Sequence, residues 1–166
     1  MLLCACCAPC SVGAVLHFRQ EYDITIWYYG SNLDTQSEYQ RRLDALEKLA
    51  HHFNLKVITH PYNHAEFLNA IKGHENQPEG GSRCIICFTQ RLNTAAQYAE
   101  LNSFDVFATT LTASPHKCAK TINQIGEQAQ STITYIPSDL KHYHNESVKF
   151  CKEHSIYRQR YCGCRK

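Results

Sequence analysis

The stretch Met1-Leu2-Leu3-Cys4-Ala5-Cys6-Cys7-Ala8-Pro9-Cys10-Ser11 opens the chain and decides its fold. Its apolar start predicts a short strand, residues 2–4, which leads directly into closely spaced cysteines and then into a helix. Ligands of open α/β sheets bind where strands end. Neighbouring cysteines such as Cys6 and Cys7 form a disulfide only with backbone strain. The stretch therefore predicts a site of thiolates directed at one polynuclear metal centre.

Strands alternate with helices along the rest of the chain. Short β-branched and aromatic runs predict the strands, and apolar residues at helical spacing predict the helices. This alternation favours the α/β class, with a parallel, doubly wound sheet flanked by helices. The length fits a single domain, residues 1–166, with a cysteine-bearing tail at 157–166. The predicted strands are residues 2–4, 24–29, 55–59, 106–111 and 133–136, and the predicted helices are residues 11–20, 35–53, 64–71, 83–99, 114–129 and 144–154.

The composition is that of an ordinary globular protein except for its ten cysteines among 166 residues. The start of the chain has no basic segment, and its apolar run is too short for a secretion signal or a membrane span. We therefore expect a cytoplasmic protein without a membrane partner, in which cysteines serve metal or redox chemistry. The formal charge of +2 neither requires nor excludes a nucleic-acid partner.

A second cysteine pair, Cys84 and Cys87, is predicted to lie one turn apart at the start of a helix. The positive end of the helix dipole favours anionic thiolates there, and the glycines at 80–81 let the backbone close around a ligand. Alone, this pair fits half of a zinc knuckle or a thioredoxin-like motif. Together with Cys6 and Cys7 it supplies four thiolates, enough for a four-iron cluster or a zinc site. Adjacent ligands favour the cluster, because its irons are separate atoms.

A third pair, Cys162 and Cys164, flanks a glycine in an aromatic tail. Such a pair can chelate one metal ion or cycle between a dithiol and a strained disulfide. Cys10 would add a third ligand from the opening loop. The remaining cysteines are predicted to pack in the interior, one of them at the end of the first strand: Cys4, Cys118 and Cys151.

Four segments stand out along the chain: CCAPC at 6–10, EGGSRCIICF at 79–88, TTLTASPHK at 109–117 and YRQRYCGC at 157–164. Together they resemble the iron–sulfur epoxyqueuosine reductases of the QueH type. The resemblance extends along essentially the whole chain, and it implies a Rossmann-like fold of the nucleotide alpha-hydrolase (HUP-like) type. It also implies the last step of queuosine biosynthesis, in which the epoxide of epoxyqueuosine at the tRNA wobble position is reduced to give queuosine.

The resemblance also implies the roles of the cysteines. The partners it implies are tRNA carrying epoxyqueuosine and an electron donor that the sequence does not identify. The sequence departs from the family at Cys4, where a histidine is usual, and at residues 30–32, where Gly-Ser-Asn replaces Asn-Pro-Asn. The second departure is expected to alter how the substrate is held. By position, Cys6, Cys7, Cys84 and Cys87 would hold a 4Fe-4S cluster, whereas Cys162 and Cys164 would form a redox-active disulfide or, with Cys10, bind one additional iron.

Removing an epoxide oxygen requires two electrons, two protons and a group that holds the departing oxygen. A cluster supplies electrons singly, and an iron with an open position would act on the oxygen as a Lewis acid. His116 and Tyr161 are candidate proton donors. Tyr28 and Tyr29 either stack on a splayed base or belong to the core. The basic residues that either contact phosphates or form a solvated face are Arg83, Arg91, Arg158, Arg160, Arg165 and Lys166.

Three other functions stay open at this point. The first is a metal-free thiol–disulfide oxidoreductase that uses the cysteine pairs at 84/87 and 162/164. The second is a zinc-stabilised RNA-binding domain without enzymatic activity. The third, an ATP-using protein of the same fold class, is disfavoured because cysteines 6–10 occupy the position of the expected glycine- and serine-rich phosphate loop. Colour and metal content after purification without oxygen would separate these functions.

Overall fold

A five-stranded, entirely parallel sheet forms the centre of the computed structural model, which describes residues 1–129 and 132–164. The strand order is β3-β2-β1-β4-β5, so the first strand of the chain lies in the middle of the sheet. Leu2 of β1 is in register with Thr25 on one side and with Phe107 on the other. The strands are β1 (Leu2–Ala5), β2 (Thr25–Tyr28), β3 (Lys56–Thr59), β4 (Val106–Thr109) and β5 (Thr134–Tyr135).

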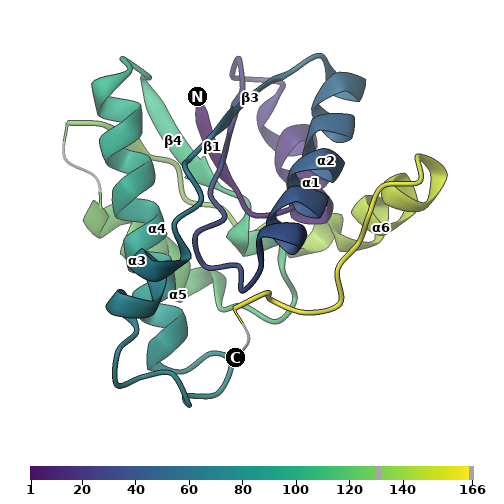
Figure 1. Ribbon diagram of the computed structural model, residues 1–166. Coiled ribbons are helices and arrows are strands. Elements are labelled where there is room, and N and C mark those ends of the chain that lie inside the picture. Colours follow the sequence, from purple (N-terminus) through teal and green to yellow (C-terminus); the bar gives the residue numbers. More distant parts are fainter. Residues whose placement is uncertain (130–131, 165–166) are drawn as a thin grey trace.

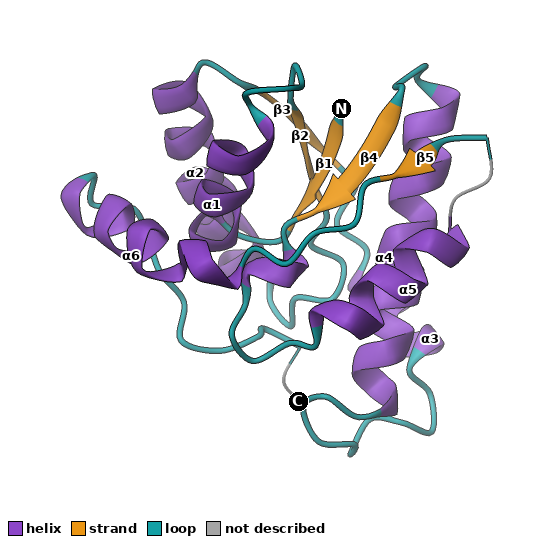
Figure 2. Cartoon of the chain, turned by 180° about the vertical axis from the view of Figure 1, so that it is seen from behind, coloured by secondary structure: helices purple, strands orange, loops and turns teal. Residues whose placement is uncertain are grey.

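Helices cover both faces of the sheet, as the alternating sequence pattern predicted (Figures 1 and 2). One face carries α1 (Ala8–Phe18), α2 (Gln36–Phe53) and α6 (His144–Glu153). The other face carries α3 (His64–Ala70), α4 (Ser82–Leu101) and α5 (Ala119–Ala129). This arrangement confirms the doubly wound α/β fold. Two short 3₁₀ helices complete the described elements, η1 (Leu111–Ala113) and η2 (Lys141–Tyr143).

Strand β1 is buried on both faces, which explains its uninterrupted apolar sequence. Leu3 and Ala5 belong to the core beneath α1 and α2, whereas Leu2 and Cys4 belong to the core beneath α4. Successive side chains of a strand point to opposite faces, so β1 joins the two cores. Cys4 lies inside β1, one residue before its end, and is completely buried.

The helix predicted at 35–53 is confirmed as α2, with Thr35 as its N-cap. The Thr35 hydroxyl accepts a hydrogen bond from the Glu38 amide at 3.2 Å, which satisfies one of the free N–H groups of the first turn. The Glu38 carboxylate binds Arg42, at 2.7 Å, one turn further along the helix. The helix ends at Asn54, whose left-handed backbone (φ +53°) closes the last turn.

The predicted start of α5 at Ser114-Pro115 is wrong. The helix begins at Ala119, and the residues before it form a turn in which the Ser114 hydroxyl accepts from the His116 amide at 3.4 Å. Ser114 has extended backbone, as expected for a residue before proline. Cys118 therefore precedes the helix and is exposed, which corrects its assignment to the core. Cys151 in α6 is buried, as predicted.

Within residues 1–129 and 132–164, no helix combines the length and the apolar character needed to cross a bilayer.

Candidate metal centre

The site lies at the carboxyl end of β1, where the chain order of the sheet reverses. From β1 the chain builds β2 and β3 outward on one side, and it then returns to place β4 on the other side. The turn at such a switch point is where open α/β sheets bind ligands. Here the turn carries the cysteines of the opening stretch. The extended segment after α6 runs beneath this edge of the sheet, toward the lower end of α4 (Figure 1).

Three cysteines of the opening turn gather around one point. The Sγ atoms of Cys6, Cys7 and Cys10 all lie within 4.8 Å of one another, and those of Cys6 and Cys7 are 3.7 Å apart. Cys7 caps α1, and the Ser11 hydroxyl in the first turn of that helix donates to the Cys7 carbonyl at 2.8 Å. The start of α1 therefore fixes the backbone between the cysteines, and their sulfurs form a potential metal-ligating group.

The cysteine pair of α4 reaches the same region. Cys84 lies in the first turn of the helix and packs in a cluster that Cys6 also contacts, while Cys87 follows in the second turn. Gly80 has a positive φ of +88°, and its amide donates to the Cys84 sulfur at 3.2 Å. The glycine loop thus provides a hydrogen bond to a thiol, which agrees with the predicted role of its flexibility.

The tail brings the third pair to the same place. Cys162 and Cys164 pack with Cys87 and with Phe67 of α3. Cys164 is 9% exposed, although it lies near the end of the described chain. All ten cysteines lie within the described residues, and all are free thiols. The seven cysteines predicted from the sequence are therefore brought together from three segments, and no disulfide links them.

A cavity of about 530 Å³ opens beside these cysteines. Its walls come from the opening turn, the start of α4, the turn after η1, the start of α6 and the tail. Both predicted proton donors, His116 and Tyr161, line it, as do Arg158 and Arg160. The volume is in the range of small-molecule sites. The cysteine sulfurs in its wall belong to Cys6, Cys7, Cys10, Cys87 and Cys162.

A buried cation, Arg91, lines the cavity together with the thiols. Its side chain is 1% exposed and donates to the Tyr29 carbonyl at 3.2 Å and to Asn32 Oδ1 at 2.5 Å. Its Nε is buried and has no hydrogen-bond acceptor within the described residues. Burial lowers the pKa of the guanidinium, but the surrounding thiolates, Cys87 first and then Cys6, raise it by more. Arg91 therefore stays charged and offsets negative charge at the site.

The thiols differ in their readiness to ionise. Hydrogen bonds with the Cys10 and Cys7 thiols hold the pKa of Cys6 well below its ordinary value, against the effect of burial. A hydrogen bond with Cys164 lowers the pKa of Cys162 to about 6, and the nearby Lys117 ammonium contributes. The thiolate, which is the form that binds metal ions, is thus favoured at Cys6 and at Cys162. Hydrogen bonds with these two residues raise the pKa of Cys10 and Cys164, and burial raises the pKa of Cys87 to about 11.

This donor set fits an iron–sulfur centre. Thiolates are the usual ligands of such clusters, and hydrogen bonds to their sulfur atoms tune them. The Gly80 amide already donates to one cysteine sulfur, and the unpartnered Nε of Arg91 is a second N–H donor beside the thiols. Arg91 and Lys117 compensate the accumulated negative charge. The residues therefore provide ligands, hydrogen-bond donors and counter-charges.

Several candidate substrate contacts lie elsewhere than the sequence suggested. Tyr28 and Tyr29 do not face the cavity for base stacking, because both are buried and pack on other aromatic rings of the core. Arg83 donates to the Glu75 carbonyl at 2.7 Å. Arg91 is the buried cation described above and not part of a solvated face. Arg165 and Lys166 lie outside the described residues.

A second buried arginine, Arg42, was not predicted from the sequence. It is 2% exposed, lines the cavity and donates hydrogen bonds to tail carbonyls, although it belongs to the polar sequence of α2.

The departure at residues 30–32 also has a structural explanation. A side chain at Gly30 would lie 2.4 Å from the Tyr39 ring, and Asn32 binds Arg91. Asn32 is itself a cavity-lining residue, so this loop positions a cation of the site.

Comparison with known proteins agrees with this geometry. The family model described as epoxyqueuosine reductase QueH matches residues 1–165. Proteins named epoxyqueuosine reductase QueH are 40% identical over 174 residues in Streptococcus pyogenes and 34% identical over 172 residues in Thermotoga maritima. Each alignment covers 99% of this chain, with 68% of the streptococcal and 88% of the Thermotoga protein. The chain therefore belongs to the epoxyqueuosine reductase QueH family of oxidoreductases.

Proposed function

We propose that this chain reduces the epoxide of epoxyqueuosine at the wobble position of tRNA and so forms queuosine. One observation carries the proposal beyond family membership. Three cysteine-bearing segments, far apart in the sequence, converge on one cavity at the carboxyl edge of the sheet. A packed core needs no such convergence, and thiolates with compensating cations suit metal-based redox chemistry.

The proposed ligands are those that the family resemblance implies, and the convergence of the thiols supports them. Cys6, Cys7, Cys84 and Cys87 hold a 4Fe-4S cluster, and Cys162 and Cys164 lie beside it with Cys10. When bound, the cluster supplies electrons one at a time, and one further iron on the second set of thiols supplies a Lewis acid for the epoxide oxygen. Without that iron, the tail thiols instead act as a redox dithiol. Cys10 lies within 4.8 Å of both Cys6 and Cys7, so the two sets of thiols adjoin.

The protein's own side chains handle the protons and the charge. In the balanced reaction both epoxide C–O bonds break, a C=C bond forms, and the oxygen leaves as water after taking up two electrons and two protons. His116 is exposed at the cavity and Tyr161 is half-buried in its wall, so each is within the proposed substrate site. Lys117 provides a cation on the same wall. An external electron carrier is required to supply the two electrons.

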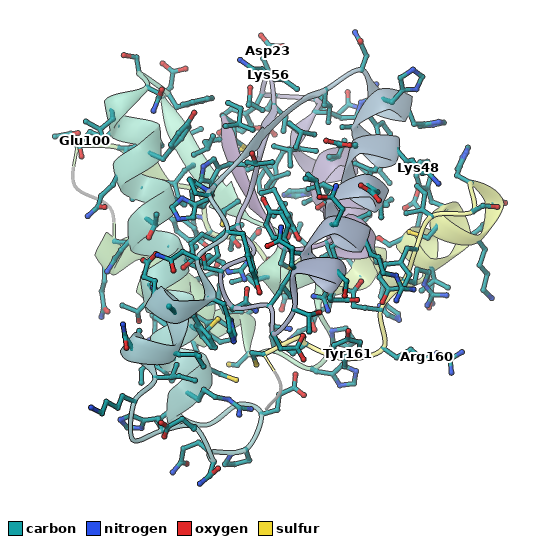
Figure 3. The ribbon with its side chains drawn as sticks, in the orientation of Figure 1. Asp23, Lys48, Lys56, Glu100, Arg160 and Tyr161 are labelled. Atoms are coloured by element: carbon teal, nitrogen blue, oxygen red, sulfur yellow. The ribbon has the colours of Figure 1, made fainter. Side chains whose placement is uncertain are left out.

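The cavity mouth suits an RNA backbone. Arg158 and Arg160 are exposed on the tail, and Figure 3 shows Arg160 extending away from the molecule beside Tyr161. Contacts between arginines and phosphates position a nucleic acid without reading its sequence. A tRNA anticodon loop held there would direct its wobble nucleotide toward the cysteines, where the nucleoside enters the cavity.

The test uses protein purified without oxygen, tRNA carrying epoxyqueuosine, and dithionite as the reductant. We expect brown protein with about four irons and four sulfides per chain, or one iron more, and queuosine in the digested tRNA by mass spectrometry. Colourless protein with stoichiometric zinc would support the RNA-binding alternative. Conversion by metal-free protein would support a thiol–disulfide oxidoreductase. Either result would overturn the cluster proposal.

A second experiment separates the tail from the cluster. Cys162→Ser and Cys164→Ser should leave the visible spectrum of the cluster nearly intact while epoxyqueuosine stays unreduced. Metal analysis then distinguishes the two roles of the tail, because an iron site loses one iron on substitution and a redox dithiol loses none. Normal queuosine formation by both variants would remove the tail thiols from the mechanism.

A further inference from the structure

Helix α2 meets the tail through the buried side chain of Arg42. Its Nε donates to Glu38 Oε1 at 2.7 Å, its Nη1 donates to the Cys162 carbonyl at 2.9 Å, and its Nη2 donates to the Tyr161 carbonyl at 3.3 Å. Every nitrogen of this planar group is therefore hydrogen-bonded. Two of them hold consecutive peptide carbonyls of the segment that carries the tail thiols.

Glu38 fixes the direction of that guanidinium. It is 3% exposed and lies one helical turn before Arg42. The Tyr157 hydroxyl donates to both of its carboxylate oxygens, at 3.1 and 3.3 Å. The same ion pair thus contacts the tail at its beginning, through Tyr157, and again at Tyr161 and Cys162, where the thiol pair starts. It spans the segment that forms one wall of the cavity.

The tail backbone fits between this ion pair and the loop before α2. Gly163 has a φ of +100°, and its carbonyl accepts from the Asp34 amide at 2.9 Å. A Cβ at this position would lie 2.5 Å from Leu33 Cδ2 and 2.8 Å from Arg42 Nη2. The peptide between the two cysteines is therefore held on both sides, with no room for a side chain.

Stability alone does not explain such an arrangement. The desolvation of two buried charges commonly cancels their attraction, and apolar residues of similar volume often serve equally well. A guanidinium also fixes the orientation of the groups that it binds, because its N–H donors lie in one plane and at fixed angles. Arg42 is also a cavity-lining residue, so the direction it imposes acts at the site itself.

We propose that Arg42, oriented by Glu38, is a positioning residue that fixes the backbone of residues 161–163 and thereby directs the Cys162 thiol into the cavity. This inference rests on the proposed function in one respect, since it assumes that the tail thiols take part in the reaction. Misplacement of a reacting group by about 1 Å can cost about a hundredfold in rate.

The test replaces Arg42 with lysine in anaerobically purified protein. Lysine keeps the charge beside Glu38 but cannot donate to both carbonyls from one plane. For Arg42→Lys we expect kcat to fall about 10- to 100-fold with an unchanged KM for tRNA. We also expect faster tryptic cleavage after Arg158 and Arg160, because the tail detaches more often. Arg19→Lys is the matched control, since Arg19 is exposed and its guanidinium lies over an aromatic ring outside the tail, that of Phe53, at 5.4 Å.

The readouts separate positioning from other roles. An unchanged kcat with a raised KM would make Arg42 a tRNA contact, and unchanged tail cleavage with a lower melting temperature would make it merely structural. Each of these results overturns the inference. Glu38→Gln, which keeps an acceptor for Arg42 and Tyr157, should shift kcat and cleavage in the same direction by less. If the wild type fails to reduce epoxyqueuosine, the proposed function fails, while the cleavage assay still decides whether Arg42 holds the tail.

Discussion

Replacing Arg91 with methionine should destabilise the protein strongly, although methionine is of similar length. The guanidinium is 1% exposed, and its loss leaves the Tyr29 carbonyl and Asn32 Oδ1 buried without their donor. An unsatisfied buried acceptor costs about 2 kcal/mol, so the two together cost about 4 kcal/mol of unfolding free energy. For a domain of this size, that loss lowers Tm by about 8–16 °C. The thiolates would also lose their counter-charge, so we expect lower iron retention.

The measurement is a thermal melt by circular dichroism of anaerobically purified protein, with iron determined per chain. Arg160→Met is the matched control, because Arg160 is exposed and extends into solvent (Figure 3). Substitutions at such surface positions usually change stability by less than about 0.5 kcal/mol, so its Tm should move by about 2 °C at most. If Arg91→Met melted within about 2 °C of the wild type and kept its iron, the reasoning about this cation would be refuted.

Three further predictions concern the cysteines, the tail and the tRNA. Cys84→Ala should lose iron and the visible spectrum, whereas Cys118→Ala should keep both because Cys118 is exposed; the opposite pattern in metal analysis would contradict the ligand assignment. Gly163→Ala should cost about 1–3 kcal/mol for the positive φ alone, before any steric clash, and a melting curve like that of the wild type would argue against a fixed tail. Arg158→Gln and Arg160→Gln should each raise the KM for tRNA and flatten its dependence on salt, which steady-state kinetics at several salt concentrations will test.

The fold could be predicted largely from local patterns. The strand at the start of the chain and the capped helix after Thr35 have signals within a few residues of sequence, and both are confirmed. The start of α5 could not be predicted in this way. Ser114 before a proline suits either a helix cap or a turn, and the residues around it do not decide between the two. The prediction for Cys118 was wrong for the same reason. It assumed that Cys118 lies on the apolar face of a helix, but α5 begins only at Ala119.

The cysteines that gather at the site could be singled out from the sequence because their spacing and residue type mark them as groups of thiols, and their role as ligands stays a prediction. The buried cations could not be singled out, because their partners are mainly backbone carbonyls. Arg42 is 120 residues from the Cys162 carbonyl that it binds, and Arg91 is 62 residues from the Tyr29 carbonyl. Every residue has a backbone carbonyl, so the sequence does not show that these arginines have such acceptors. Both arginines therefore look like residues of solvated helical faces. The role of Tyr29 also stayed open, because an aromatic residue at the end of a strand can either stack on a bound base or pack in the core.

The convergence of three distant segments has a consequence for how the protein persists in a cell. A centre held jointly by the opening turn, the start of α4 and the tail would act as a cross-link that closes two long loops of the chain. Its binding free energy would then count toward folding, since the unfolded chain has no preformed site. Iron supply would thus govern how much of the protein survives proteolysis as well as how fast it works, and starved cells would contain less of it.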